Sequence, residues 1–202
     1  MGEVTGVENL TLDGVLQAPG RPDEDPRGGF AHGGWAQPYA DAVMGRVMGE
    51  RMARAMAGDG ALLLGRRTYE DFAGYWPART DNPFTPVLDA VRKYVVSTTL
   101  REPLPWRNST LLAGDAAESV ARLRESGPDL TVLGSGELVR TLARADLVDT
   151  YLLSIHPLVL GTGRRLFDAG EEPSTLRLVD SVTTTTGVLI ATYRPARRSL
   201  AA

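Results

Sequence analysis

The sequence predicts a single α/β domain with three layers, in which helices cover both faces of a mostly parallel sheet. Short apolar runs typical of buried strands alternate along the chain with stretches of helical spacing. Two strand-like runs then follow one another near the C-terminus, which predicts an antiparallel edge. With 202 residues, 43% of them hydrophobic, the chain is long enough to bury a core without disulfides or a metal.

The first third of the chain contains a strand, a long irregular segment and a helix. Residues 4–17 read as a strand broken at Asp13-Gly14 by a turn or bulge. In residues 18–38, nine of 21 residues are Pro or Gly, so neither helix nor strand can propagate and we expect an active-site loop. Residues 39–57 predict a helix with one apolar stripe, made by Val43, Val47, Met48, Met52, Ala55 and Met56.

The rest of the chain alternates between the two kinds of element. Helices are expected after Gly65 and ending before Trp76, from Asp115 to about 125, and from about 137 to 143, with a helical turn at 83–90. Buried strands are expected at 61–64, 93–97, 109–113, 129–133 and 147–156. The last two strands, 176–186 and 188–193, are separated by Gly187, which predicts a hairpin or bulge.

Composition excludes several classes of function. The chain has 22 basic and 25 acidic residues and a net charge of -3, so it lacks the positive field that holds nucleic acid. It has no cysteine, which removes disulfides, thiolate zinc sites and cysteine nucleophiles. No signal-peptide pattern or membrane-length apolar run is present, so we expect a cytoplasmic protein with no membrane partner.

Three strand-to-helix junctions have the composition of phosphate sites. Residues 65–68 (GRRT) follow an apolar strand and open a helix, where free amides, the helix dipole and two arginines favour an anion. Gly134-Ser135-Gly136 repeats this logic with small residues that let a phosphate approach the backbone. Ser97-Thr98-Thr99 supplies hydroxyls at a third strand end. Each could also be a plain turn or cap, but together they would meet at one edge of the sheet.

Other nucleotide and hydrolase motifs are missing. A Rossmann fingerprint would need glycine at position 139, which is Val139, and no Gly-Lys-Ser/Thr ending of a Walker motif occurs. The surroundings of Ser135 lack a full Gly-x-Ser-x-Gly elbow, so a serine hydrolase is disfavoured. The two histidines, His32 and His156, have no nearby second ligand, so we expect no metal site.

These junctions, in this order and after Thr11-Leu12-Asp13-Gly14-Val15, resemble the dihydrofolate reductase superfamily. Within it the chain is most similar to the C-terminal reductase domain of bifunctional riboflavin-biosynthesis deaminase-reductases and to their stand-alone relatives. The specific segments are 64–70 (LGRRTYE), 132–138 (VLGSGEL) and 155–161 (IHPLVLG), followed by Gly163 and Leu166-Phe167. The resemblance covers about residues 4–194. It implies a dihydrofolate-reductase-like three-layer sandwich over the single domain 1–202.

The resemblance also implies a reductase that uses NADPH and takes a small heterocyclic substrate. It places Gly65, Arg66, Arg67 and Thr68 at the adenine-side phosphates and Ser97 and Thr98 near the 2'-phosphate. It places Gly134, Ser135, Gly136 and Glu137 at the pyrophosphate and nicotinamide. Leu12, Asp13 and Leu16 would border the nicotinamide and the substrate. We also expect a homodimer.

The substrate side is less defined. Asp41 matches the carboxylate that assists protonation in dihydrofolate reductases, but it could equally be a helix cap. His32, within the long loop, is the second catalytic candidate, because it could contact a ligand or deliver the proton. The aromatic residues of this loop suit a flat heterocycle or an oligomer contact. The best single label is a 5-amino-6-(5-phosphoribosylamino)uracil reductase of riboflavin biosynthesis. A dihydrofolate reductase and a non-catalytic nucleotide-binding protein remain alternatives, and without cysteine the chain cannot deaminate by the zinc route.

Overall fold

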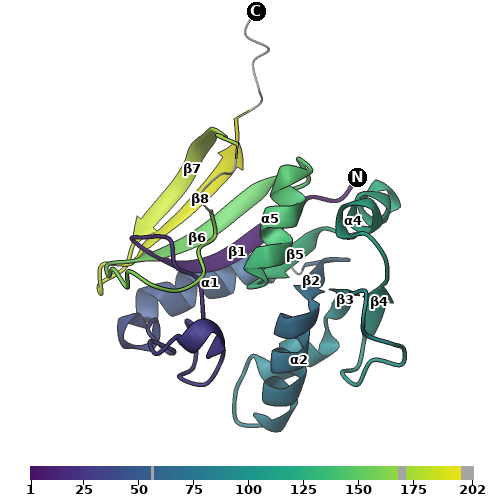
Figure 1. Ribbon diagram of the computed structural model, residues 1–202, viewed down its shortest axis with the longest axis horizontal. Helices are drawn as coiled ribbons and strands as arrows, with labels where there is room; N and C mark the ends of the chain where they lie inside the picture. The colour runs from purple at the N-terminus through teal and green to yellow at the C-terminus, as the bar shows by residue number, and fades with distance from the viewer. Residues whose placement is uncertain (56, 168–171, 197–202) are drawn as a thin grey trace, which may run out of the picture.

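The computed structural model describes residues 1–55, 57–167 and 172–196. These residues form an eight-stranded sheet in the order β4-β3-β2-β5-β1-β6-β8-β7 (Figure 1). Strands β1 to β6 run parallel to one another, whereas β8 pairs antiparallel with both β6 and β7, as the sequence predicts. The strands are β1 (Val4–Thr11), β2 (Ala61–Gly65), β3 (Arg92–Val96), β4 (Ser109–Leu112), β5 (Leu130–Leu133), β6 (Thr150–His156), β7 (Leu176–Thr183) and β8 (Leu189–Pro195).

Helices cover both faces of the sheet, which confirms the predicted three layers. On one face, α4 and α5 pack against a core that includes Leu63, Val132 and Leu153. On the other face, α2 and α3 pack against Leu62 and Leu64, and α1 continues this layer over β1, β6 and β8. The helices are α1 (Ala42–Ala55), α2 (Arg66–Tyr75), α3 (Thr85–Ala90), α4 (Ala116–Ser126) and α5 (Gly136–Arg144).

Strand β1 occupies the centre of the sheet and has two neighbours of different extent. Its pairing with β5 ends at Val7 opposite Leu133, where the chain turns away at Gly134 towards α5. Its pairing with β6 continues for four more residues, as far as Thr11 opposite His156. The sheet therefore opens between β1 and β5 at the carboxyl ends of the strands, which is where open α/β sheets bind ligands.

Some predicted boundaries were wrong, for local reasons. The break predicted at Asp13-Gly14 is present, although β1 already ends at Thr11: Gly14 adopts a positive φ of 79° and the chain doubles back, so that Val15 bridges Arg165. The predicted strand 147–156 begins at Thr150, because the preceding residues close the end of α5, with the Leu147 N–H donating to the Leu142 carbonyl. Met56 of the predicted apolar stripe lies outside the described residues.

The segment 18–38 has more structure than the sequence predicts. It contains two short 3-10 helices, Arg27–Gly29 and Gln37–Tyr39. Phe30 and Trp35 are buried against Val15 and Ala18, which gives the segment a small core of its own. In the described part of the chain, no helix combines the length and the apolar character needed to cross a bilayer.

Candidate active site

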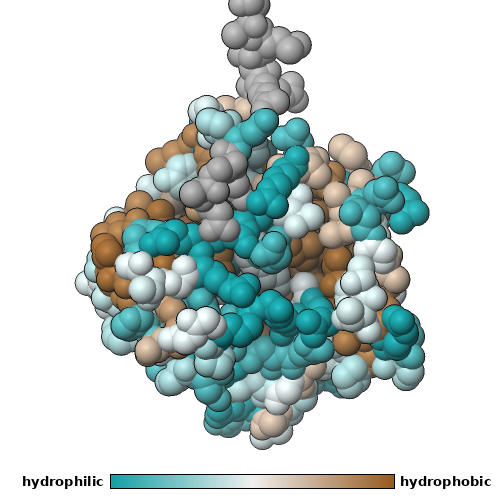
Figure 2. Space-filling view, viewed as in Figure 1, coloured by the Kyte–Doolittle hydropathy of each residue, from teal (hydrophilic) through white to brown (hydrophobic). Residues whose placement is uncertain are grey.

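A cavity of about 950 Å³ lies at the carboxyl ends of β1, β2 and β5. Its walls come from the first turns of α2 and α5, the segment 16–27 and the pair Arg164-Arg165. Hydrophilic side chains gather across the middle of this face of the molecule, between the 18–38 segment and α2 (Figure 2). The volume is that of a site for a sizeable organic ligand.

Two helix N-termini open on this cavity side by side. Gly65 precedes α2 and Ser135 precedes α5, and neither helix has a side-chain cap for its first amides. The Ser135 Oγ instead accepts a hydrogen bond of 3.0 Å from the Gly65 N–H, which ties the two junctions together. Free first-turn amides and the positive ends of two helix dipoles then face the same space, and this arrangement favours an anion.

The turn from β5 into α5 is shaped for close approach of a ligand. Gly134 and Ser135 have φ values of 62° and 61°, the left-handed region, and the Gly134 N–H donates to the Val7 carbonyl at 3.1 Å. A Cβ atom on Gly136 would lie 2.5 Å from the Leu16 Cδ2, so this position accepts no larger residue unless Leu16 moves. Glycine at position 136 therefore lets the Leu16 side chain pack directly against the start of α5, whose first amides have no side-chain cap.

Seven arginines among the described residues line the cavity. Five of them are already paired with acids: Arg21 with Asp71, Arg27 with Asp25, Arg66 with Glu70, Arg140 with Glu137, and Arg165 with Asp13. The remaining two, Arg67 and Arg164, form no ion pair within the described residues. They are therefore the arginines with charge available for an anionic ligand.

The structure brings together most, but not all, of the sequence-predicted cofactor residues. The cavity is lined by Leu16, Gly65, Arg66, Arg67, Thr68, Gly134, Ser135, Gly136 and Glu137. Ser97 and Thr98 are not among the lining residues, although the preceding Val96 is. The Ser97 Oγ accepts hydrogen bonds from the N–H groups of Thr99 and Leu100, which is the geometry of a turn-forming serine.

Leu12 and Asp13 also lie outside the lining. The Leu12 side chain is exposed. The Asp13 carboxylate accepts hydrogen bonds from Thr11 Oγ1 and from the N–H groups of Leu160 and Gly161. These hydrogen bonds lower the pKa of Asp13 to about 2, and the one from Thr11 has the largest effect. Asp13 therefore fixes the turn after β1 against the segment that follows β6.

Neither predicted catalytic residue lines the cavity. Asp41 caps α1: its Oδ1 accepts from the Met44 N–H at 2.7 Å, and its Oδ2 accepts from the N–H of Thr185 at 2.7 Å. These hydrogen bonds lower the pKa of Asp41 to about 2, and the one from the Met44 N–H has the largest effect. His32 is exposed, with its ring edge against Phe30. The contacts of Asp41 fit the capping alternative.

Sequence reasoning missed two polar residues of β1 that do line the cavity, Glu8 and Asn9. Glu8 is 5% exposed, and its Oε1 is buried without a hydrogen-bond partner. Burial raises the pKa of Glu8 to about 8. The signal available in the sequence was the pair itself, because two polar residues interrupt a run that otherwise reads as a buried central strand.

Asn9 is held from behind by the buried His156. Its Oδ1 lies 3.1 Å from the His156 Nε2, and burial lowers the pKa of His156 to about 4, so the imidazole is neutral. The edges of Trp35 and Tyr39 contact the same ring. Part of the 18–38 segment thus supports the back of the site.

The first half of the 18–38 segment forms one wall of the cavity. Arg21 pairs with Asp71 on α2, and its guanidinium lies 4.2 Å from the centre of the Tyr75 ring. Gln17 is buried and donates to the carbonyls of Asp25 and Arg27, which fixes the shape of this wall. The segment is therefore joined to α2 and contacts the cavity directly.

Comparison with known proteins agrees with this picture. A family model described as "RibD C-terminal domain" matches residues 4–190. The chain is 30% identical over 138 residues to the uncharacterized protein YyaP of Bacillus subtilis (strain 168), covering 65% of this chain and 72% of YyaP.

Solved structures share the fold. A putative riboflavin biosynthesis protein from Shewanella sp. PV-4 is 20% identical, with a TM-score of 0.66 over 96% of this chain and 99% of that one. A diaminohydroxyphosphoribosylaminopyrimidine deaminase/5-amino-6-(5-phosphoribosylamino)uracil reductase from Thermotoga maritima is 15% identical, with a TM-score of 0.60. That match covers 96% of this chain and 57% of the Thermotoga protein. These likenesses confirm the predicted dihydrofolate-reductase-like fold.

Proposed function

This chain belongs to the RibD C-terminal domain family, and we propose that it is an NADPH-dependent reductase. Its substrate would be a ribosylaminopyrimidine or a pteridine-like heterocycle, with the 5-amino-6-(5-phosphoribosylamino)uracil reductase type as the best single label. The observation that carries the proposal is the pair of uncapped helix N-termini, joined through Ser135, at the wall of a 950 Å³ cavity.

The residues at this wall fit a dinucleotide. The first amides of α2 and α5, which have no side-chain cap, would hold the pyrophosphate, and Gly136 lets Leu16 pack against the start of α5 without displacing it. The cofactor supplies the hydride when it is bound. The protein binds it and orients it towards the opening between β1 and β5.

Arg67 is the residue we assign to phosphate selectivity. It is the second residue of α2, it lines the cavity, and it forms no ion pair within the described residues. A guanidinium can bind a phosphate through two parallel hydrogen bonds, which makes a 2'-phosphate more favourable than a hydroxyl. Arg66 is partly engaged by Glu70 at 3.0 Å and would contribute less.

The substrate would lie beside the opening of the sheet. Asn9 is fixed by His156 and offers an amide to a heterocycle, while Phe72, Tyr75 and Trp76 supply aromatic surface to the cavity. Reduction also needs a proton at the substrate. Because Asp41 and His32 lie outside the lining, we assign proton delivery to water.

The test combines cofactor binding with turnover. NADPH should bind saturably, and its reduced-nicotinamide absorbance should fall when a ribosylaminopyrimidine is added. The matched variants are Gly136→Ala, which places a methyl group against Leu16, and Gly45→Ala on α1, where an added Cβ meets nothing within 4 Å. We expect only the first to weaken NADPH binding.

The outcomes separate the alternatives. Turnover with dihydrofolate and none with the ribosylaminopyrimidine would identify a dihydrofolate reductase. Saturable binding without turnover on either would favour a non-catalytic nucleotide-binding protein. Absence of binding by both NADPH and NADH would overturn the proposal.

A further inference from the structure

Glu8 is a buried acid that the fold itself does not use. Its Oε1 is buried without a hydrogen-bond partner, and no described residue forms a salt bridge with its carboxyl group. Buried polar groups are almost always hydrogen-bonded, and leaving one unpaired costs about 1–3 kcal/mol. An unpaired buried group that borders a cavity indicates a ligand that supplies the missing partner.

The position of Glu8 is specific. It is the first residue of β1 beyond the last pair with β5, so it stands where the sheet opens. A Cβ on Gly6 would point at Val139 of α5, and Glu8, two residues further on, lies on that same face. Gly136 and Leu16, which also line the cavity, close this side. Glu8 thus lines the same cavity as the first turns of α2 and α5.

Two arginines on the elements next to Glu8 are paired with other acids. On α5, Arg140 pairs with Glu137, and in the segment after β6, Arg165 pairs with Asp13. His156 on β6 belongs to the opposite face, where it contacts Asn9. Arg67 and Arg164 line the same cavity without an ion pair among the described residues, but no described cation forms a salt bridge with the Glu8 carboxyl. The space beside Glu8 can therefore take a cation that comes from outside.

We infer that Glu8 binds the positively charged ring of the oxidised nicotinamide cofactor, and thereby makes the site discriminate between oxidised and reduced cofactor in a pH-dependent way. This inference rests on the proposed function. The two cofactor forms share their phosphates, their adenine and their ribose groups. They differ at the nicotinamide ring, which is a flat cation in the oxidised form and neutral in the reduced form.

The protonation of Glu8 sets the direction of the effect. An ionised carboxylate in a low-dielectric site is costly unless a cation pairs with it, and burial accordingly raises the pKa of Glu8 to about 8. At pH 7 about nine in ten free protein molecules then carry the proton. When the oxidised cofactor binds, the proton leaves to the buffer and the carboxylate pairs with the ring. No electrons move in this step.

The test is the ratio of the affinities for NADP⁺ and NADPH, measured by calorimetry between pH 6 and pH 9. The ratio should rise about tenfold per pH unit below pH 8 and then level off. Taking the ratio removes the titration of the 2'-phosphate, which both forms carry and whose second pKa is near 6.

Glu8→Gln keeps the shape of the side chain without the charge, so the affinity ratio of this variant should not vary with pH. The control Glu50→Gln, on the exposed face of α1, should behave as the wild type.

Proton release gives a second readout that needs no variant. Titrations in two buffers of different ionisation enthalpy should show close to one proton released per NADP⁺ bound at pH 7, and none per NADPH. A flat ratio with no proton release in a protein that binds both forms would overturn the inference alone. A pH-dependent substrate affinity with a flat cofactor ratio would assign Glu8 to the substrate and overturn it too. If neither form binds, the proposed function fails and the inference with it.

Discussion

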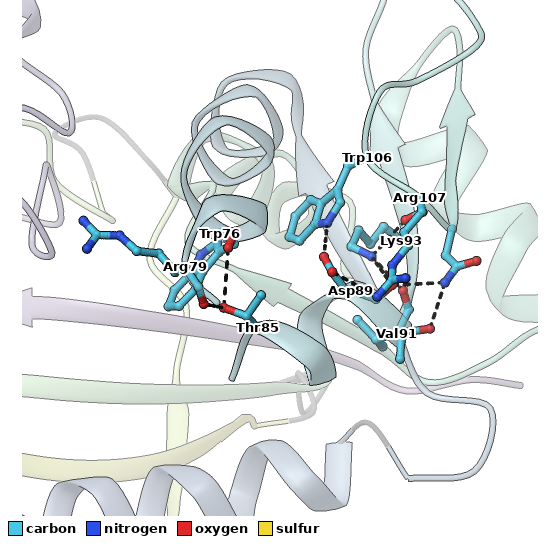
Figure 3. A network of polar contacts seen from close by, with 10 residues as sticks. Trp76, Arg79, Thr85, Asp89, Val91, Lys93, Trp106 and Arg107 are labelled. Atoms are coloured by element: carbon cyan, nitrogen blue, oxygen red, sulfur yellow. Dashed lines mark hydrogen bonds and ion pairs between the residues drawn. The ribbon is translucent and has the colours of Figure 1, made fainter. Parts of the chain in front are cut away.

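Lys93 and Glu8 are both buried ionisable residues on central strands, and their surroundings differ completely. Lys93 is fully buried near the start of β3, where its Nζ donates to the carbonyls of Val91 at 2.9 Å and Arg107 at 3.1 Å (Figure 3). It also lies 4.3 Å from the centre of the Trp106 ring. Glu8 is equally buried at the other end of the sheet, with its Oε1 unpartnered beside the cavity.

The hydrogen bonds around Lys93 are made between residues of the protein itself. Asp89 accepts from Trp106 Nε1 at 2.7 Å and from Arg107 Nη2 at 2.9 Å, and neither Lys93 nor these neighbours line the cavity (Figure 3). A buried charge whose hydrogen bonds are supplied by the protein serves the fold. A buried ionisable group without such partners, at the wall of a cavity, is the kind of group that we infer to meet a ligand. The comparison therefore separates structural from functional groups by their partners and not by their burial.

Removing Lys93 should give the largest change in stability. Lys93→Met would remove the donor to the carbonyls of Val91 and Arg107 and the contact of the ammonium group with Trp106, so we expect a loss of about 3 kcal/mol in the free energy of unfolding. Denaturant unfolding measures it. The neighbouring exposed Arg92→Met should change stability by less than about 0.5 kcal/mol. A loss below about 1 kcal/mol for Lys93→Met would mean that the network is not structural.

Glu8→Gln should act in the opposite direction. Because the folded-state pKa of Glu8 is raised to about 8, the folded protein holds a proton that the unfolded chain has lost, and stability falls as pH rises towards 8. The variant lacks this loss. Its advantage over the wild type should grow by about 1.4 kcal/mol per pH unit between pH 6 and pH 8. Unfolding curves that stay parallel over this range would contradict the burial of an unpaired acid.

Arg67 tests the ligand side of the comparison without any cost to the fold. Arg67→Ala removes an exposed side chain that has no ion pair in the described structure, so unfolding should be unaffected. NADPH affinity should fall about tenfold, the value of one charge-assisted contact, while NADH affinity stays the same. Arg46→Ala on α1 is the control. An equal loss for NADPH and NADH would move Arg67 from the 2'-phosphate to the pyrophosphate.

Ser135 has both a structural and a ligand-binding part in this account, so its replacement should have a smaller effect on stability and on NADPH affinity. Ser135→Ala deletes the acceptor of the Gly65 N–H, which we expect to lower stability by about 1 kcal/mol. Because this hydrogen bond aligns the two helix N-termini, NADPH affinity should fall by a few-fold as well. Calorimetry and denaturant unfolding on the same variant check the two effects. Unchanged affinity would show that the junctions are held in place without it.

Asp41→Asn should have the least effect on ligand binding. Asparagine can cap α1 as aspartate does, but an amide nitrogen cannot accept from Thr185 and Thr186 as the Asp41 Oδ2 does. We expect a lower melting temperature and unchanged NADPH affinity and turnover. The lowered pKa of Asp41, about 2, means that its stabilising contact persists above pH 4 and is lost as pH falls towards 2. A large fall in turnover would restore Asp41 as the proton donor.

The sequence was sufficient for the features that depend on local pattern. The element order and the antiparallel edge follow from apolar spacing, and the structure brings two of the three predicted junctions, those at Gly65 and Ser135, side by side. It was insufficient where a role depends on distant partners. Asp41 reads as a catalytic acid until Thr185, 144 residues away, is seen to hold it.

Glu8 illustrates the same limit from the other side. The sequence Val7-Glu8-Asn9 does not show whether β5 pairs with β1 at these residues. In the structure β5 ends at Leu133, so Glu8 lies beyond the last β1–β5 pair and beside the cavity. Ser97 shows the reverse case, in which a plausible phosphate contact is consumed by the amides of its own turn. Pairing and register decide these roles, and they are properties of the folded chain.

Amide hydrogen exchange with and without NADPH locates the ligand within the fold. The first-turn amides of α2, Arg66 to Thr68, and those of α5, Gly136 and Glu137, should exchange more slowly together when NADPH is added, because one pyrophosphate would contact both helix N-termini. Amides of the Lys93 network should not change. Slowing confined to one helix, or slowing around Lys93 with both junctions unaffected, would contradict the assignment of the cavity as the cofactor site.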